Sequence, residues 1–281
     1  MKKLFTLILA LAMLACAALA EDIPDTSRVA DESEMTDVED IVPEGMTPVT
    51  PDMLNDGVYD DIQVESSSAM FKIVGCTLTV KEGQMTALLR MKSEAYTFMY
   101  PGTAQEAAQA PYEDLQMLQE LDDGYAFILP VDALDAGYTC AAFSARKQAW
   151  YPRTLLFRAD SLPLEAWSTL TTAETLGLED GDYTVDVALS GAGKATLASP
   201  AALHVAGGEC TADIVFSTSK IDYVLVDGQK LEPTATEGGA AFTVPVKAFG
   251  VGLAIVADST AISPAVEVPY TMTFDAASIA K

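Results

Sequence analysis

The sequence contains little histidine and few basic residues. Its 281 residues include one histidine, His204, and 16 lysines and arginines against 41 aspartates and glutamates, which gives a formal net charge of −25. Serine- and cysteine-hydrolase triads use histidine as a general base, and no G-x-S-x-G motif accompanies His204, so such a hydrolase is not indicated. The acidity argues against binding to nucleic acid or to an anionic membrane, because both are polyanions. We therefore expect a protein that is not an enzyme.

Cysteine is also scarce, and after the first twenty residues no apolar run is long enough for a transmembrane helix. None of the four cysteines lies in a C-x-x-C pair, so a metal or redox centre of that kind is not indicated. Lys2 and Lys3 precede an apolar run over residues 4–14, and A-L-A at residues 18–20 matches a cleavage site. We predict a signal peptide over residues 1–20, and a mature chain that is secreted or held at the extracellular surface. Lipidation of Cys16 is the alternative.

Three cysteines remain in the exported chain: Cys76, Cys140 and Cys210. An oxidising compartment favours disulfides, and an odd count leaves one thiol free or in an intermolecular bond. Because Cys76 and Cys140 both fall in the first of the two domains described below, we predict a disulfide between them.

The stretch after the signal peptide is acidic and lacks apolar periodicity. Residues 21–50 hold ten acidic residues, one arginine and three prolines. Such a composition self-repels and buries little apolar surface. We therefore predict a disordered acidic spacer over residues 21–54.

The rest of the chain contains an internal repeat with an offset near 120 residues. The matching segments are D-G-V-Y at 56–59 and D-G-D-Y at 180–183, L-T-V-K-E-G at 78–83 and L-H-V-A-G-G at 203–208, F-I-L-P-V-D-A-L at 127–134 and F-T-V-P-V-K-A-F at 242–249, and P-R-T-L-L-F at 152–157 and P-Y-T-M-T-F at 269–274. Four matches in the same order indicate two homologous domains. We place them at residues 55–161 and 180–277, joined by a linker over residues 162–179.

Each copy has the pattern of an antiparallel β-sandwich. Short alternating segments are separated by turn residues, such as Asp227-Gly228, at the spacing typical of immunoglobulin-like domains. One helix is expected at residues 104–110, where Thr103 and Glu106 form a capping box. The fold class is therefore all-β, with two tandem immunoglobulin-like β-sandwich domains and a short helical insertion in the first.

Both copies resemble the near-iron-transporter (NEAT) domain in layout, and the first copy also carries motifs similar to those of that family. The resemblance lies in S-S-S-A-M-F at residues 66–71, followed by L-T-V-K-E-G-Q-M at residues 78–85. In that family a serine-led short helix forms a lip over the ligand and precedes a hairpin of this kind. The resemblance implies secreted or surface domains of Gram-positive bacteria that bind haem between the lip and the last hairpin. The family's last strand carries Tyr-x-x-x-Tyr, whereas this chain has Lys147-x-x-x-Tyr151 in the first copy and Val266-x-x-x-Tyr270 in the second.

The last hairpin of the first copy contains an acid-free stretch over residues 137–158. Four cations, Arg146, Lys147, Arg153 and Arg158, and two aromatic residues, Trp150 and Tyr151, lie there. Arginine can clamp carboxylates or phosphates, including haem propionates, and the aromatic rings can stack on a planar ligand or a sugar. The alternative is that the cations pair with this protein's many acids and that Trp150 closes the end of the sandwich.

Two further candidate ligand-binding residues lie outside this stretch. Met70 follows the serines of the lip, and its thioether can be an axial haem ligand or can fill a gap in the core. Tyr100 ends an aromatic run before the expected helix, whose N-terminus can receive an anion. Core packing beside an ordinary helix cap is the alternative for Tyr100.

The leading functional hypothesis is capture of a small anionic or planar ligand, with haem or another iron compound implied by the resemblance. A cell-surface or transporter partner would receive the ligand. The rival hypothesis is a structural or adhesive surface protein that binds glycans or other proteins. A carbohydrate-active enzyme using paired carboxylates is a third alternative that no motif favours.

Overall fold

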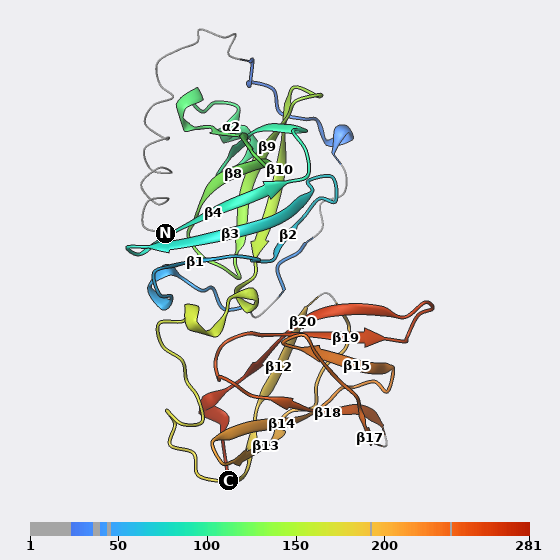
Figure 1. The fold of residues 1–281 in the computed structure, drawn as a ribbon. Coiled ribbons are helices and arrows are strands. Elements are labelled where there is room, and N and C mark those ends of the chain that lie inside the picture. Colours follow the sequence, from blue (N-terminus) through green and yellow to red (C-terminus); the bar gives the residue numbers. More distant parts are fainter. Residues whose placement is uncertain (1–23, 36–39, 44–45, 192, 237) are drawn as a thin grey trace.

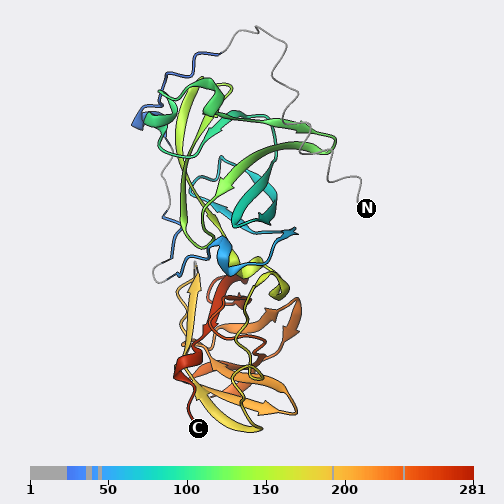
Figure 2. The same ribbon diagram turned by 90° about the vertical axis from the view of Figure 1, so that its left-hand side faces the viewer.

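The computed structural model describes residues 24–35, 40–43, 46–191, 193–236 and 238–281. The predicted signal peptide and Cys16 lie outside these residues. The chain forms two antiparallel β-sandwiches that are stacked end to end (Figures 1 and 2). This confirms the all-β fold class with two tandem sandwiches.

The first sandwich consists of two five-stranded antiparallel sheets. One sheet has the order β1 (Gly57–Tyr59), β3 (Ile73–Lys81), β4 (Gln84–Met91), β8 (Gly124–Val131) and β7 (Gln119–Leu121). The other has the order β2 (Val64–Ser66), β10 (Ala149–Phe157), β9 (Gly137–Ser144), β5 (Tyr96–Tyr100) and β6 (Gln116–Met117). Alternation along β3 and β4 directs Leu78, Ala87 and Leu89 into the core, where all three are fully buried.

The second sandwich repeats this topology strand for strand. Its sheets have the orders β11 (Gly181–Val185), β13 (Ala201–Ala206), β14 (Glu209–Val215), β18 (Gly239–Pro245), β17 (Thr234–Thr236), and β12 (Val187–Gly191), β20 (Val266–Phe274), β19 (Leu253–Ser259), β15 (Ile221–Val226), β16 (Gln229–Leu231). The pairing registers agree as well: Val80 faces Met85 in the first sandwich, and Val205 faces Cys210 in the second. The internal repeat in the sequence therefore corresponds to equivalent strands.

The two copies differ between the fifth and sixth strands of the repeat. In the first sandwich, α2 (Ala104–Ala107) lies between β5 and β6, with the expected capping box of Thr103 and Glu106. In the second, a turn at Asp227-Gly228 joins β15 to β16 directly. The helix is shorter than the expected 104–110. Beyond Ala108 each backbone N–H donates to the carbonyl three residues earlier instead of four, and Pro111 follows. Short 3₁₀ helices occupy Glu32–Glu34, Pro51–Met53, Tyr112–Asp114, Ala159–Ser161, Leu164–Ala166 and Ala276–Ser278.

The prediction of a disordered spacer over residues 21–54 is wrong for the parts that the structure describes. Three of its few apolar residues form backbone bridges: Val29 with Trp150, Val49 with Leu134, and Leu54 with Trp167. Val49 and Leu54 belong to the core of the first sandwich. Sparse apolar side chains thus dock the stretch where composition alone indicated disorder.

The junction between the sandwiches is packed and contains a buried charge network. Ala248 and Val251 of the second sandwich join the core of the first, together with Ala166 and Trp167 from the linker. Arg158 donates to the carboxylates of Glu65 and Asp160 and to the hydroxyl of Thr271. The side chains of Arg158 and Asp160 are only 6% and 5% exposed, so this network is enclosed within the junction.

The predicted disulfide between Cys76 and Cys140 is wrong. Both cysteines are free and buried, as is Cys210. Cys76 lies in β3 and Cys140 in β9, which belong to opposite sheets. Membership of one sandwich does not by itself bring two cysteines into bonding distance, because a disulfide needs Cα atoms about 4.4–6.8 Å apart. Burial raises the pKa of both thiols to about 12, so they stay protonated within the core.

Among the residues that the structure describes, no helix has the length and apolar character needed to cross a membrane.

Candidate functional site

The structure divides the predicted site residues among separate surroundings. Arg146 and Lys147 are exposed in the turn between β9 and β10, and neither forms an ion pair with the described residues. Trp150, Tyr151 and Arg153 are buried along β10. The side chains predicted from the acid-free stretch therefore do not form one open site.

Trp150 is covered by the N-terminal strap, by which we mean residues 24–35. Its indole donates a 2.7 Å hydrogen bond to the carbonyl of Thr26, and its backbone pairs with Arg28 and Ala30. Its ring packs on Phe143 at 5.2 Å in the cluster beneath α2. Trp150 is completely buried, so in this arrangement it cannot stack on a ligand. It packs on the outer face of its sheet rather than at the end of the sandwich, where the alternative interpretation had placed it.

Tyr100 also lies away from an open site. It is half-buried against the cluster of Phe98, Ala104, Ala107, Leu115, Ala141, Phe143 and Trp150 on the outer face of its sheet. The short helix α2 covers this face. This position fits the alternative of packing beside a helix cap.

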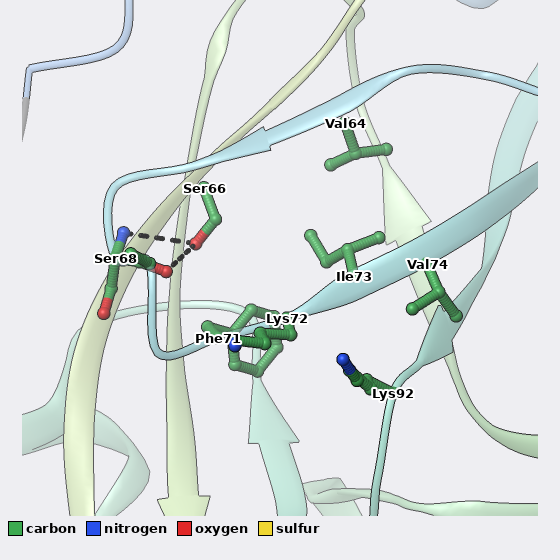
Figure 3. A pocket seen from close by; sticks show the side chains of 9 residues that line it. Val64, Ser66, Ser68, Phe71, Lys72, Ile73, Val74 and Lys92 are labelled. Atoms are coloured by element: carbon green, nitrogen blue, oxygen red, sulfur yellow. Dashed lines mark hydrogen bonds between the residues drawn. The ribbon is translucent and has the colours of Figure 1, made fainter.

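A cavity lies beneath the lip, residues 66–71, where the seam between β2 and β3 is open. Its volume is about 400 Å³, and we call it the lip groove. The residues that line it are Val64, Ser66, Ser68, Ala69, Phe71, Lys72, Ile73, Val74 and Lys92. Figure 3 shows Val64 on β2 and Ile73 on β3 facing one another across this seam, with Lys72 and Lys92 beside it. A volume of this size is within the usual range for small-molecule sites.

Two smaller spaces adjoin the lip groove. A cavity of about 370 Å³ continues along the seam and shares Val64, Ile73 and Val74 with it. A space of about 60 Å³ on the other side is lined by Met70, Met91 and Tyr96 and shares Lys72 and Lys92. Met70 is 64% exposed. Of the predicted site residues, Met70 therefore lies at the rim of the groove.

Lys72 and Lys92 form the cationic side of the lip groove. The backbone N–H of Lys92 donates to the carbonyl of Lys72 at 3.0 Å, which fixes the two residues side by side. Neither ammonium forms an ion pair with any carboxylate of the described residues. In a chain of net charge −25, these two adjacent lysines are thus cations that no described carboxylate neutralises.

The sequence did not reveal the lysine pair because a β-bulge changes the register. The β3–β4 hairpin pairs regularly from its turn, where Lys81 faces Gln84, as far as Gly75, which faces Arg90. If this one-to-one pairing continued, Lys72 would face Ser93. The register shifts between Ile73 and Gly75, so Ile73 faces Met91 and Lys72 meets Lys92. Only the structure places the bulge.

Behind the groove, Phe71, Tyr96, Arg153 and Tyr151 form a buried aromatic and cationic stack. Phe71 and Tyr96 meet edge-on at 5.1 Å. The Arg153 guanidinium lies 5.7 Å from the ring centre of Tyr96 and 5.4 Å from that of Tyr151. Burial is the main cause that raises the pKa of Tyr151, so its hydroxyl stays protonated. The stack connects the acid-free stretch to the lip groove through Tyr96.

A search for metal ligands gives no candidate. Within the described part of the chain, no group of three or more histidine, cysteine, aspartate or glutamate side chains could hold a metal ion. His204 has Asp182 and Asp213 on opposite ring nitrogens, at 2.7 and 3.2 Å, so its partners do not converge on one point.

Comparison with known proteins gives a limited result. No family model matches the chain, and no curated protein matches it. Among solved structures, a mutant of the IsdX2-NEAT5 domain in complex with heme is similar over 35% of this chain and 97% of its own, with 14% sequence identity and a TM-score of 0.31. The function of the lip groove must therefore follow from its own residues.

Proposed function

We propose that the first sandwich is an exported, non-enzymatic receptor that binds a planar anionic ligand in the lip groove, and that haem is this ligand. The observation that carries the proposal is the unpaired cations of Lys72 and Lys92 beside an apolar cavity of about 400 Å³. The likeness of residues 66–71 and 78–85 to the NEAT lip and hairpin supports haem in particular.

The groove offers the two kinds of contact that a porphyrin needs. The apolar side chains of Val64, Phe71 and Ile73 can take the face of the ring, because burying apolar surface contributes about 25 cal/mol per Å². The ammonium groups of Lys72 and Lys92 can pair with its propionates. The hydroxyl of Ser68 is buried without a hydrogen-bond partner, and it would gain one from a bound carboxylate.

Iron coordination would depend on the rim of the groove. Lys147, at the position of the family's ligand tyrosine, is exposed in the β9–β10 turn and supplies no phenolate. Met70 is the predicted site residue that lines the rim, and its thioether can coordinate haem iron. We therefore propose Met70 as an axial ligand and expect weaker iron ligation than a tyrosinate gives.

The test is a titration of the full mature chain with hemin, followed by its Soret band. The variant Lys72→Thr/Lys92→Ser should weaken binding at least tenfold, because charge-assisted hydrogen bonds to two carboxylates are lost. Lys81→Ala removes another exposed lysine of the same hairpin outside the groove and is the matched control. Absence of a Soret shift at micromolar protein and hemin would reject haem.

A second candidate function is adhesion to a protein through the same rim. It is favoured by Met70 and Val74, whose side chains are 64% and 62% exposed beside the groove, because exposed apolar side chains mark interaction surfaces when they cluster. Cell binding that persists in Lys72→Thr/Lys92→Ser but is lost in Met70→Ser/Val74→Ser, without any Soret band, would favour adhesion over haem capture.

A further inference from the structure

Arg153 is a buried cation that forms no ion pair with any carboxylate among the described residues. Arg153 is only 6% exposed. One terminal nitrogen donates to the carbonyl of Pro152 at 2.7 Å, the other donates to the hydroxyl of Tyr96 at 3.1 Å, and the Nε has no partner. A buried charge without a counter-ion is costly to keep.

Arg158, on the same stretch of chain, shows how this protein treats a buried arginine elsewhere. Arg158 is as buried as Arg153, yet it pairs with both Glu65 and Asp160. Acidic side chains are abundant in the sequence, with 41 in 281 residues. The lack of one beside Arg153 is therefore a local property of this site.

The groups around Arg153 do not become anionic in its place. Burial raises the pKa of the Cys140 thiol to about 12, although the guanidinium acts in the opposite direction. Burial likewise raises the pKa of Tyr151. The rings of Tyr96 and Tyr151 attract the cation through their π faces, but such contacts contribute less than an ion pair at a buried site.

The second sandwich shows that the fold does not require a cation at this position. The repeat aligns Arg153 with Tyr270, a neutral residue that is 4% exposed. Glycines lie against the Tyr270 ring: a Cβ at Gly191 would come within 3.1 Å of it, and one at Gly193 within 1.8 Å of its hydroxyl. The second sandwich thus has an aromatic ring at this position, whereas the first has a charged guanidinium.

We propose that Arg153 is the inner anion receptor of the lip groove, and that the ligand is a planar molecule with at least two carboxylates. One carboxylate pairs with Lys72 and Lys92 at the mouth. The other reaches Arg153 when the Tyr96 side chain, which lines the adjoining space and now accepts the Arg153 hydrogen bond, turns aside. This inference rests on the proposed function for the location of the site, but it does not require iron or a porphyrin.

The chemical class follows from the two cationic positions. A monoanion would satisfy only one of them and would leave the buried guanidinium unpaired. A flat dicarboxylate also suits the aromatic stack, because Phe71 and Tyr96 offer ring edges and faces rather than hydrogen-bond donors along the path. The affinity of the receptor should therefore depend more on the number of carboxylates in the ligand than on whether the ligand carries a metal.

The experiment compares the full mature chain with Arg153→Tyr, which carries the residue of the second sandwich, and with Arg153→Met. The probes are hemin, hemin dimethyl ester, and terephthalate with terephthalamide as its neutral control. In the absence of a probe, both variants should melt at a higher temperature than the wild type, since an unpaired buried charge is removed. Both should lose at least tenfold in affinity for hemin and all of the thermal shift given by terephthalate, while weak binding of the dimethyl ester is unchanged.

The outcomes separate the two proposals. If terephthalate stabilises the wild type but not the variants, while hemin does not bind, Arg153 is the anion receptor and haem is rejected. If both variants bind hemin and terephthalate as tightly as the wild type, the role of Arg153 is overturned while haem capture stands. If neither probe binds the wild type, or if terephthalamide stabilises it as terephthalate does, the dicarboxylate receptor is overturned.

Discussion

The two sandwiches share a topology but differ at the position of the lip groove. In the first, the backbone bond from Lys92 to Lys72 brings two cations together, and in the second the equivalent bond runs from Ser217 to Thr196. The Ser217 hydroxyl then accepts a hydrogen bond from the Thr196 backbone, so the polar groups there satisfy one another. The unpaired lysines of the first sandwich thus correspond, in the second, to a serine and a threonine that hydrogen-bond to each other. The comparison shows that the same fold accommodates an unpaired cationic pair in one copy and an internally hydrogen-bonded pair in the other.

The largest expected effect tests whether the copies are structurally independent. Phe127 and Phe242 are equivalent in the repeat and fully buried, so replacing either with alanine should cost about 3–5 kcal/mol. Tryptophan fluorescence reports on the first sandwich, because Trp150 and Trp167 both pack in its clusters. We expect Phe242→Ala to shift the urea transition seen by tryptophan as well, since Ala248 and Val251 join the first core. A tryptophan transition that is unchanged in Phe242→Ala would show independent domains.

The next effect concerns the junction. Arg158→Met leaves Asp160, whose side chain is 5% exposed, without its cation, and should lower the free energy of unfolding by about 3 kcal/mol. The matched control is Arg90→Met, because the pair of Arg90 and Asp123 is 36% and 70% exposed and such pairs contribute less than about 1 kcal/mol. Equal losses in the two variants, measured by urea denaturation, would show that the junction network does not couple the copies.

A smaller expected effect is a pH dependence of stability that comes from Asp135 in the first sandwich and has no counterpart at Gly250 in the second. Asp135 and Gly250 both have positive φ, of 52° and 74°, and both donate from their N–H to the end of the last strand, at Phe157 and Phe274. Burial raises the pKa of Asp135 to about 6 from its ordinary value of 3.8. The protonated form is therefore favoured in the folded state, and its contribution to stability is lost as the pH rises through about 6.

Asp135→Asn keeps an oxygen acceptor for the Ala159 N–H without the charge. It should be more stable than the wild type by about 2 kcal/mol at pH 7 and nearly equal to it at pH 4. Melting temperatures at these two pH values check this. A stability difference that does not change with pH would contradict burial of the charged form as the cause.

The smallest effect lies in the second sandwich. Hydrogen bonds that the His204 ring donates to the carboxylates of Asp182 and, to a smaller extent, Asp213 raise the pKa of His204 above its ordinary value of 6.5. A raised pKa for a base means that its contribution to stability is complete below pH 6.5 and is lost as the pH rises through the folded-state pKa. Since His204 is 40% exposed, the gap in melting temperature between wild type and His204→Gln should be small. It should be largest below pH 6 and close at alkaline pH, and a gap that widens with pH would contradict the ion pairs.

Much of the fold could be predicted from the sequence, because it depends on local patterns. Alternation along residues 73–91, the turn at Asp227-Gly228 and the capping box of Thr103 and Glu106 each act over a few residues. The internal repeat then extended these local features to two copies. The all-β class and the two-copy organisation follow from such features, whereas the strand order depends on pairings between distant segments.

The site could be predicted only in part, because its geometry depends on distant contacts. The lip and Met70 were found from a motif, whereas Lys72 and Lys92 meet only because a bulge shifts the register. The strap pairs Val29 with Trp150 across 121 residues of sequence and removes that ring from solvent. No periodicity in the chain encodes either event, so the sequence leaves open whether the acid-free stretch forms a binding site or a packed hairpin. The structure shows packing for Trp150 and burial for Arg153.

The bulge at Val74 also determines how the lip groove can change in descent. Val74 is the extra residue of the bulge, so loss of its codon would leave Ile73 opposite Met91 and Lys72 opposite Lys92. Pairing of Val74 itself with Met91 in a regular ladder would instead set Lys72 against Ser93. Neither lysine would be altered, and the strands beyond Gly75 would keep their partners. The lysine pair therefore tolerates deletion of Val74, and it is lost when the strand keeps its length and loses the bulge.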